Sequence, residues 1–274
     1  AIDPDALYRL KPAFRARAEL EHRNLVRLGE LLHSGGHWFF TMELVDGVSF
    51  IDWIRPGEVV GPARTRVDIQ HGVLDEARLR DGLLQLADAL HALHLAGKLH
   101  RDLKPSNVMV TPEGRLVLLD FGLILAVTEA GREGLAVGTP VYMSPEQASD
   151  QALGPASDWY GVGAMLYEAL TGRRPFEGDS EQVMTRKQRE LPRPPAEVNP
   201  DAPADLAALA LQLLAPRVSA RATWKPVFDA LGSVPSASAL ANAKAPPMEL
   251  VGRDRELAVL AQALADAERG GTAM

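Results

Sequence analysis

The 274-residue sequence contains no cysteine. A chain without cysteine forms no disulfide bond, offers no thiol nucleophile and cannot build a zinc site from thiolates. This absence fits a reducing compartment, and we expect a cytoplasmic protein. The sequence also has no apolar run approaching the roughly 20 residues of a membrane-spanning helix, and no signal peptide opens it. We therefore expect no membrane partner.

The sequence also has fewer basic than acidic residues. Lysine and arginine number 29 against 36 for aspartate and glutamate, which gives a formal net charge of −7. Net negative charge disfavours nucleic acid as the main partner, because a phosphate backbone attracts basic surfaces. Hydrophobic residues make up 46% of the chain, which is enough for a sizeable core in one large domain or two smaller ones.

The residues with the most chemistry lie in the stretch H-R-D-L-K-P-S-N, His100 to Asn107. Asp102 is a carboxylate that can accept a proton from an attacking hydroxyl, and Lys104 is a cation that can lie against a transferring phosphate. Asn107 offers an amide oxygen, a hard ligand that suits Mg²⁺. A lone Asp or Lys would indicate only a solvated charged loop, but this ordered combination favours phosphoryl transfer.

Two apolar runs follow, Val108 to Val110 and Leu116 to Leu119, and the turn signal T-P-E-G separates them. This pattern predicts a β-hairpin. Asp120 comes directly after it, in the tripeptide D-F-G. Because a hairpin brings its two ends together, we expect Asn107 and Asp120 to share one Mg²⁺ site.

H-R-D-L-K-P-S-N resembles the catalytic loop of eukaryotic-type protein kinases, and D-F-G resembles their metal-binding motif. Lys104 is typical of the Ser/Thr branch. The resemblance extends from Phe14 to Leu231. The motif W-F-F-T-M-E-L-V-D-G and the long C-terminal extension are most similar to bacterial Ser/Thr kinases fused to large ATPase-type regulators. It implies an α+β, two-lobe fold with a truncated β-rich N-lobe and a mainly helical C-lobe. It also implies ATP and Mg²⁺ as cofactors and a Ser/Thr-containing protein as substrate.

The same resemblance implies an adenine site. Strands are predicted at Leu25 to Leu32 and Trp38 to Val45, and the second resembles the strand that enters the kinase hinge. Met42 would then be the gatekeeper residue beside adenine, and the backbone of Glu43 and Val45 would hydrogen-bond it. Met109 would pack under the adenine ring. Without the kinase context, an edge hairpin with a buried methionine is the better interpretation.

Other positions take their expected roles from the resemblance. Residues 123–138 resemble the activation loop, and Thr139 matches the threonine that bonds the catalytic aspartate and lysine. Glu146 is expected to pair with Arg221, although an ordinary surface ion pair is the alternative. Asp158 would accept hydrogen bonds from backbone amides of the catalytic loop, or would simply cap the helix that follows it.

Control of activity can also be predicted. Arg101 matches the arginine that, in many kinases, binds an activation-loop phosphate. Thr128 is the only hydroxyl-bearing residue between Gly122 and Gly138, and it lies among glutamates. We therefore predict that activity does not depend on phosphorylation of this loop.

Helices are predicted from Phe50 to Ile54, Asp75 to Ala96, Asp158 to Gly172 and Asp205 to Leu214. In the second of these, Asp75 is the expected N-cap and Gly97 the expected C-cap. His91 and His94 lie one turn apart on it, a spacing that can bind metal. With no third ligand evident, packing or surface placement is the better interpretation.

Part of the kinase pattern is absent. The glutamate expected in the kinase helix C falls on Ala13, and an apolar position of that helix is occupied by Arg17. Nothing resembles the Gly-rich phosphate loop or its strand lysine, which we expect upstream of Ala1. These departures leave a pseudokinase or a nucleotide-sensing regulatory module as the alternative function.

Motifs and changes in composition along the chain predict four segments. We expect a partial N-lobe at residues 1–45, a C-lobe at 46–232, and an Ala/Ser/Pro linker at 233–248. Residues 249–274 would begin a second module, because V-G-R-D-R-E-L resembles the entry to ATPase modules. This ATPase-type regulator is the expected partner within the full-length chain, and a plain amphipathic tail helix is the alternative.

Overall fold

The structure is a computed structural model that describes residues 14, 18, 20–34, 37–57, 72–119, 140–149 and 151–241. By compactness the chain divides into two units, Ala1–Ala243 and Lys244–Met274, and every described residue belongs to the first. Several positions singled out in the sequence lie outside the described residues: Ala13, Arg17, Asp120, Thr128, Thr139 and the module expected at 249–274.

A three-stranded antiparallel sheet, in the order β3-β4-β5, contains the predicted hairpin. Its strands are β3 (Val48–Ser49), β4 (Val108–Val110) and β5 (Leu116–Leu118). The pairing of β4 with β5 confirms the hairpin. Gly114 has a φ of 81° in the connecting turn, a left-handed conformation that glycine adopts without steric cost.

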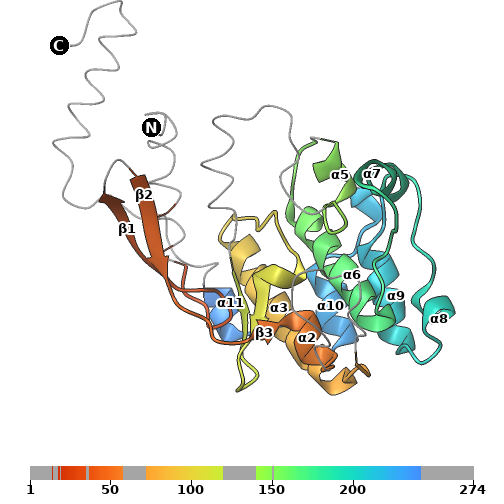
Figure 1. Cartoon of the computed structure of the whole chain (residues 1–274), viewed down its shortest axis with the longest axis horizontal. Coiled ribbons are helices and arrows are strands. Elements are labelled where there is room, and N and C mark those ends of the chain that lie inside the picture. Colours follow the sequence, from red (N-terminus) through yellow and green to blue (C-terminus); the bar gives the residue numbers. More distant parts are fainter. Residues whose placement is uncertain are drawn as a thin grey trace, which may run out of the picture. The chain divides into compact units, whose positions relative to one another are not determined.

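A second, two-stranded sheet consists of β1 (Leu28–Ser34) and β2 (His37–Met42), which pair antiparallel (Figure 1). The predicted strand pair is confirmed, but β1 begins three residues later than expected and β2 ends three residues earlier. The residues before β1 have another partner. The N–H of Val26 donates to the carbonyl oxygen of Leu118 at 3.0 Å, and the N–H of Leu118 donates to the main-chain carbonyl oxygen of Asn24 at 2.8 Å. This short segment therefore connects the two sheets.

Helices α2 (Phe50–Ile54) and α3 (Glu76–Leu95) form where the sequence predicts them. The side chain of Asp75 accepts a hydrogen bond from the N–H of Arg78 at 3.0 Å, and Gly97, with a φ of 68°, follows the last turn. The apolar stripe of α3 is fully buried and consists of Leu79, Leu83, Leu86, Leu90 and Leu93. A regular leucine spacing was therefore sufficient to locate this helix.

Helix α6 (Pro155–Thr171) packs against α9 (Ala204–Leu213), which matches the predicted helix at 205–214 within one residue. The expected start of α6 at Asp158 was wrong, because the helix begins three residues earlier. Proline is favoured in the first turn, where its missing N–H costs nothing, and Gly154 occupies the N-cap position. Asp158 therefore lies inside the first turn and is not a simple N-cap.

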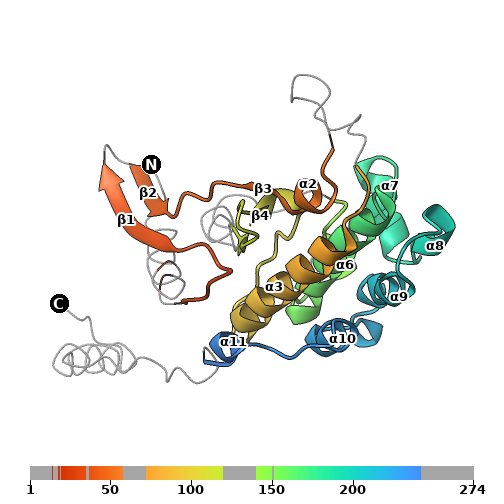
Figure 2. The ribbon, with the colours of Figure 1, turned by 90° about the horizontal axis from the view of Figure 1, so that it is seen from below.

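The remaining short elements are η1 (Pro105–Asn107), α5 (Pro145–Ala148), α7 (Ser180–Lys187), α8 (Pro195–Val198), η2 (Val218–Ala220), α10 (Trp224–Ala230) and α11 (Ala237–Ala241). Helices α10 and α11 pack against α3 (Figure 2). Among the described helices, none has the length and apolar character needed to cross a membrane.

Helix α11 lies within the segment expected to be a linker. Its Ala239 is fully buried, and the N–H of Ser236 donates to the carboxylate of Asp88 on α3 at 2.8 Å. The described part of that segment is therefore not a free linker. Its composition was misleading because small alanine side chains also allow a short helix to approach α3 closely.

Candidate active site

The loop between α3 and η1, residues 98–104, is referred to below as the HRD loop. Arg101 in this loop has a φ of 69°, a conformation that costs free energy for a residue with a side chain. Its backbone is held on both sides. The N–H donates to Asp158 Oδ1 at 2.7 Å, and the carbonyl oxygen accepts a hydrogen bond from Gln147 Nε2 at 2.6 Å. These contacts offset the strain and fix the residue next to Asp102.

Asp158 is the buried carboxylate that organises this loop. Its Oδ2 accepts a hydrogen bond from the N–H of His100 at 2.8 Å and lies 2.8 Å from His94 Nε2. Burial acts to raise the pKa of Asp158, but the hydrogen bonds from His94 and from the Arg101 backbone outweigh it, so the pKa lies below its ordinary value. The carboxylate therefore stays charged and keeps its hold on two consecutive backbone amides.

His94 is thus engaged with Asp158, and the ring of His91 stacks near Trp224 with centroids 4.7 Å apart. Among the residues that the structure describes, no group of three His, Cys, Asp or Glu side chains is placed to hold a metal ion. Of the two placements expected, packing rather than surface placement is what the contacts of both histidines show.

The side chains of the HRD loop and η1 converge on Asp102. Lys104 Nζ lies 2.6 Å from Asp102 Oδ2, and Asn107 Nδ2 donates to the same oxygen at 3.0 Å and to the Asp102 carbonyl oxygen at 2.8 Å. Both donors use Oδ2, which leaves Oδ1 to accept a proton from an incoming hydroxyl. The side chains of Asp102 and Lys104 are 30% and 25% exposed, so a substrate can reach them.

Asn107 fits the expected metal site. Because Nδ2 of its planar amide is fixed on Asp102, Oδ1 is turned away from that residue and can serve as a hard oxygen ligand. The N–H of Leu119 donates to the carbonyl oxygen of Asn107 at 2.8 Å. The residue before Asp120 is therefore adjacent to Asn107, although Asp120 itself lies outside the described residues.

The residues expected at the adenine site lie on the segment between β2 and β3 and on β4. Met42 ends β2 and is 46% exposed, so the alternative of a buried methionine is wrong. The N–H of Glu43 donates to the carbonyl oxygen of Arg27 at 2.9 Å, so this N–H is already engaged within the protein. Val45 packs partly against the core, and Met109 pairs with Ser49 of β3 across the sheet.

The carboxylate of Glu43 has a separate structural contact. It accepts hydrogen bonds from Arg115 at 2.6 and 3.2 Å, and these bonds lower the pKa of Glu43. This pair ties the segment after β2 to the start of β5.

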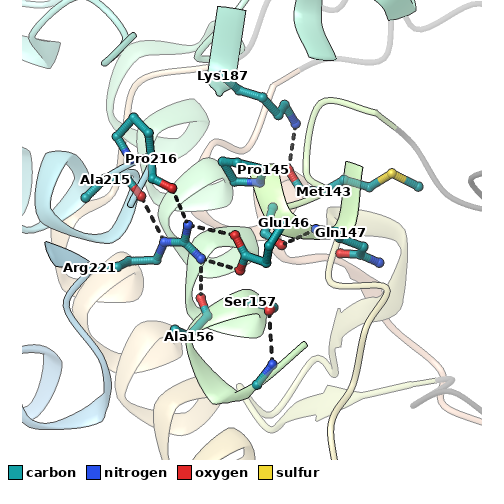
Figure 3. Close-up of polar contacts among 12 residues, drawn as sticks. Met143, Pro145, Glu146, Gln147, Ala156, Ser157, Lys187, Ala215, Pro216 and Arg221 are labelled. Atoms are coloured by element: carbon teal, nitrogen blue, oxygen red, sulfur yellow. Dashed lines mark hydrogen bonds and ion pairs between the residues drawn. The ribbon is translucent and has the colours of Figure 1, made fainter. Parts of the chain in front are cut away.

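Glu146 on α5 and Arg221 after η2 form a buried, two-pronged ion pair (Figure 3). The two nitrogen–oxygen distances are 2.6 and 2.9 Å, and the side chains are 3% and 0% exposed. Arg221 also donates to the carbonyl oxygens of Ala215, Pro216 and Ala156. The surface ion pair considered as an alternative is therefore wrong. Burial acts to raise the pKa of Glu146, but the bonds from Arg221 lower it below its ordinary value.

A model of the protein kinase domain family matches residues 14–230. The chain belongs to the protein kinase family. It is similar to the serine/threonine-protein kinases PknA and PknL of Mycobacterium tuberculosis, with 34% identity over 208 residues and 36% over 182 residues. These alignments cover 73% and 66% of this chain but 44% and 42% of the relatives. A probable serine/threonine-protein kinase of Streptomyces coelicolor is 33% identical over 223 residues, 78% of this chain and 31% of the relative.

The chain thus spans less than half the length of the curated relatives it matches. The α+β kinase fold predicted from the sequence is confirmed by the family match together with the small sheets and the helical remainder. Relatives from mycobacteria and Streptomyces support the bacterial origin that the sequence motifs indicated. Kinases of this family use ATP and a divalent metal ion.

Two residues near the site of this kinase domain were missed in the sequence. Gln147 follows Glu146 and binds the Arg101 carbonyl, a contact that no local pattern indicates. Lys187 lies in the charged run T-R-K-Q-R-E, which is typical of a solvated helix face, yet it is 0% exposed. One signal was present: the buried Val183 lies one turn earlier on α7, so both residues occupy the same face.

The stability of the kinase domain is expected to rise with pH above neutrality because of Lys187. Burial lowers the pKa of Lys187 to about 7, whereas a lysine in an unfolded chain titrates near pH ~10.4. Between these values the unfolded state binds more protons, so the free energy of unfolding rises by up to about 1.4 kcal/mol per pH unit. Urea unfolding from pH 6.5 to 9 measures this slope.

Lys187→Met should lose this part of the slope, while Lys225→Met, at an exposed lysine of α10, should retain it. The same slope in wild type and in Lys187→Met would contradict the prediction.

Proposed function

We propose that this protein is a serine/threonine kinase that transfers the γ-phosphoryl group of ATP to a Ser or Thr hydroxyl of a protein substrate. The observation that carries the proposal is the arrangement around Asp102. Lys104 and Asn107 both hold Oδ2, which orients the carboxylate and presents Oδ1 to a hydroxyl group. Phosphoryl transfer depends mainly on such positioning and on charge stabilisation.

Each residue then has a defined part. Asp102 orients the substrate hydroxyl and accepts its proton, and Lys104 neutralises charge on the transferring group. Asn107 and Asp120 would hold Mg²⁺, which supplies positive charge to the ATP phosphates. Asp158 and Arg101 act by fixing the loop, and the Glu146–Arg221 pair by fixing the segment that follows Thr139. Thr139 would bond Asp102 and Lys104.

The adenine ring would lie between the segment after β2 and strand β4. The carbonyl oxygen of Glu43 and the N–H of Val45 would form its hydrogen bonds, Met42 would border it and Met109 would pack under it. The engagement of the Glu43 N–H with Arg27 supports this assignment, because, of the two backbone groups of Glu43, it removes the N–H as a partner for adenine.

Control of the kinase is proposed to come from the module expected at residues 249–274, with its ATPase-type character. The scarcity of hydroxyl groups in the activation loop supports this view, because Thr128 is poorly placed for a switch phosphate. The division of the chain between residues 243 and 244 supports a boundary there. We also propose a cytoplasmic location, where ATP is available as the phosphate donor.

The function is tested by incubating the purified full-length protein with Mg²⁺, radiolabelled ATP and myelin basic protein. Acid hydrolysis of the labelled substrate should give phosphoserine or phosphothreonine. Phosphotyrosine would contradict the Ser/Thr assignment. ATP binding without any transfer would instead favour the pseudokinase or nucleotide-sensing alternative, which binding measurements by calorimetry would reveal in parallel.

A further inference from the structure

A buried lysine is bonded to the segment that borders the proposed catalytic loop. Lys187, the last residue of α7, is 0% exposed. Its Nζ donates to the carbonyl oxygens of Met143 at 2.6 Å and Val141 at 3.3 Å, and also to that of Pro140. Figure 3 shows the side chain reaching from α7 to Met143. Three carbonyl oxygens thus meet the three N–H donors of one ammonium group.

This arrangement costs free energy, since a buried ammonium group loses its hydration. Within the described part of the chain, no carboxylate forms a salt bridge with Lys187, and its Nζ lies over the ring of Tyr160, 5.4 Å from the centroid. Main-chain carbonyls are therefore its principal partners. Residues 140–143 form no helix or strand of their own, and the hydrogen bonds from Lys187 fix their backbone.

The fixed segment lies beside the proposed catalytic residues. Tyr142 and Met143 line the same small hollow as Arg101 and Asp102. Gln147, shortly after the segment, donates to the Arg101 carbonyl oxygen. A protein chain that brings a hydroxyl group to Asp102 can therefore contact residues 140–143, and the shape of that backbone then limits how the chain lies.

We propose that Lys187 is a positioning residue for the protein substrate, because it holds residues 140–143 in the conformation that receives the chain around the accepting Ser or Thr. The inference rests on the proposed kinase function. Lys187 touches neither ATP nor the reacting atoms, and it acts through the backbone of this segment. Its loss therefore affects the protein substrate more than it affects ATP.

The test is steady-state kinetics of the full-length protein with myelin basic protein and Mg-ATP at pH 6.5. Lys187→Met has a similar length but no donor, and it should raise the KM for the protein substrate about tenfold or more. The KM for ATP should change by less than about twofold. Lys225→Met, at an exposed lysine, is the matched control and should change neither KM.

An equal rise in both KM values, or a lower kcat with both KM values unchanged, would show a merely structural role and overturn the inference. If Lys187→Met does not fold, Lys187→Gln replaces it, because its amide keeps two N–H donors. That variant should show a smaller rise in the protein KM alone, and an unchanged protein KM would equally overturn the inference. A wild type that transfers no phosphate to protein would contradict the proposed function itself, which keeps the two failures distinct.

Discussion

Replacing Asp102 with alanine is expected to slow phosphoryl transfer by about a thousandfold, which corresponds to about 4 kcal/mol of lost transition-state stabilisation. In the proposed mechanism the carboxylate orients the attacking hydroxyl and accepts its proton, and Lys104 and Asn107 already bind its Oδ2. The measurement is kcat of the full-length protein at saturating Mg-ATP and protein substrate.

Asp102→Asn sharpens this test because it preserves the shape of the side chain and removes only the negative charge. It should lose nearly as much activity as the alanine variant. Asp201→Ala, at an exposed aspartate remote in sequence from the HRD loop, is the control and should retain wild-type activity. Equal rates for wild type and Asp102→Ala would refute the assignment of Asp102.

Removing Arg221 is expected to have the largest effect on stability. Arg221→Met leaves the buried carboxylate of Glu146 without its partner and deprives three carbonyl oxygens of a donor. Breaking a buried ion pair in this way costs about 3–5 kcal/mol. Urea unfolding measures the loss as a lower midpoint with an unchanged slope.

The matched control is the exposed pair of Lys225 and Asp229 on α10, whose nitrogen–oxygen distance of 2.7 Å is similar. Lys225→Met should cost less than about 1 kcal/mol, because solvent screens the pair. The comparison separates burial from geometry. If both variants lost the same small amount, the buried pair would contribute no more than a surface pair, contrary to the expectation.

Local signals were sufficient for the elements that lead into the site. The leucine spacing of α3, its Asp75 cap and Gly97 all act within a few residues, and the T-P-E-G turn likewise set the β4–β5 hairpin. The H-R-D-L-K-P-S-N stretch is compact in sequence, so the proximity of Asp102, Lys104 and Asn107 follows from chain connectivity. These parts of the fold could be predicted because their causes are local.

The remaining features depend on contacts between distant segments. Lys187 is surrounded by charged neighbours in sequence, and its burial results from the packing of α7 beside residues 140–143. The burial of Glu146 with Arg221, 75 positions away, has the same kind of cause. Helix α11 also forms against α3 despite a composition typical of linkers. No periodicity or turn signal encodes such contacts, because tertiary packing decides them.

The contacts of Asp88 have a consequence for folding cooperativity. One carboxylate oxygen lies 3.1 Å from His22 Nε2, and the other accepts the N–H of Ser236, so two segments separated from Asp88 by 66 and 148 positions share one buried group. Opening either segment exposes to water the carboxylate group to which the other segment is also bonded. We therefore expect the stretch that leads into β1 and the stretch that carries α11 to open together, so that loss of amide protection in one should accompany loss in the other.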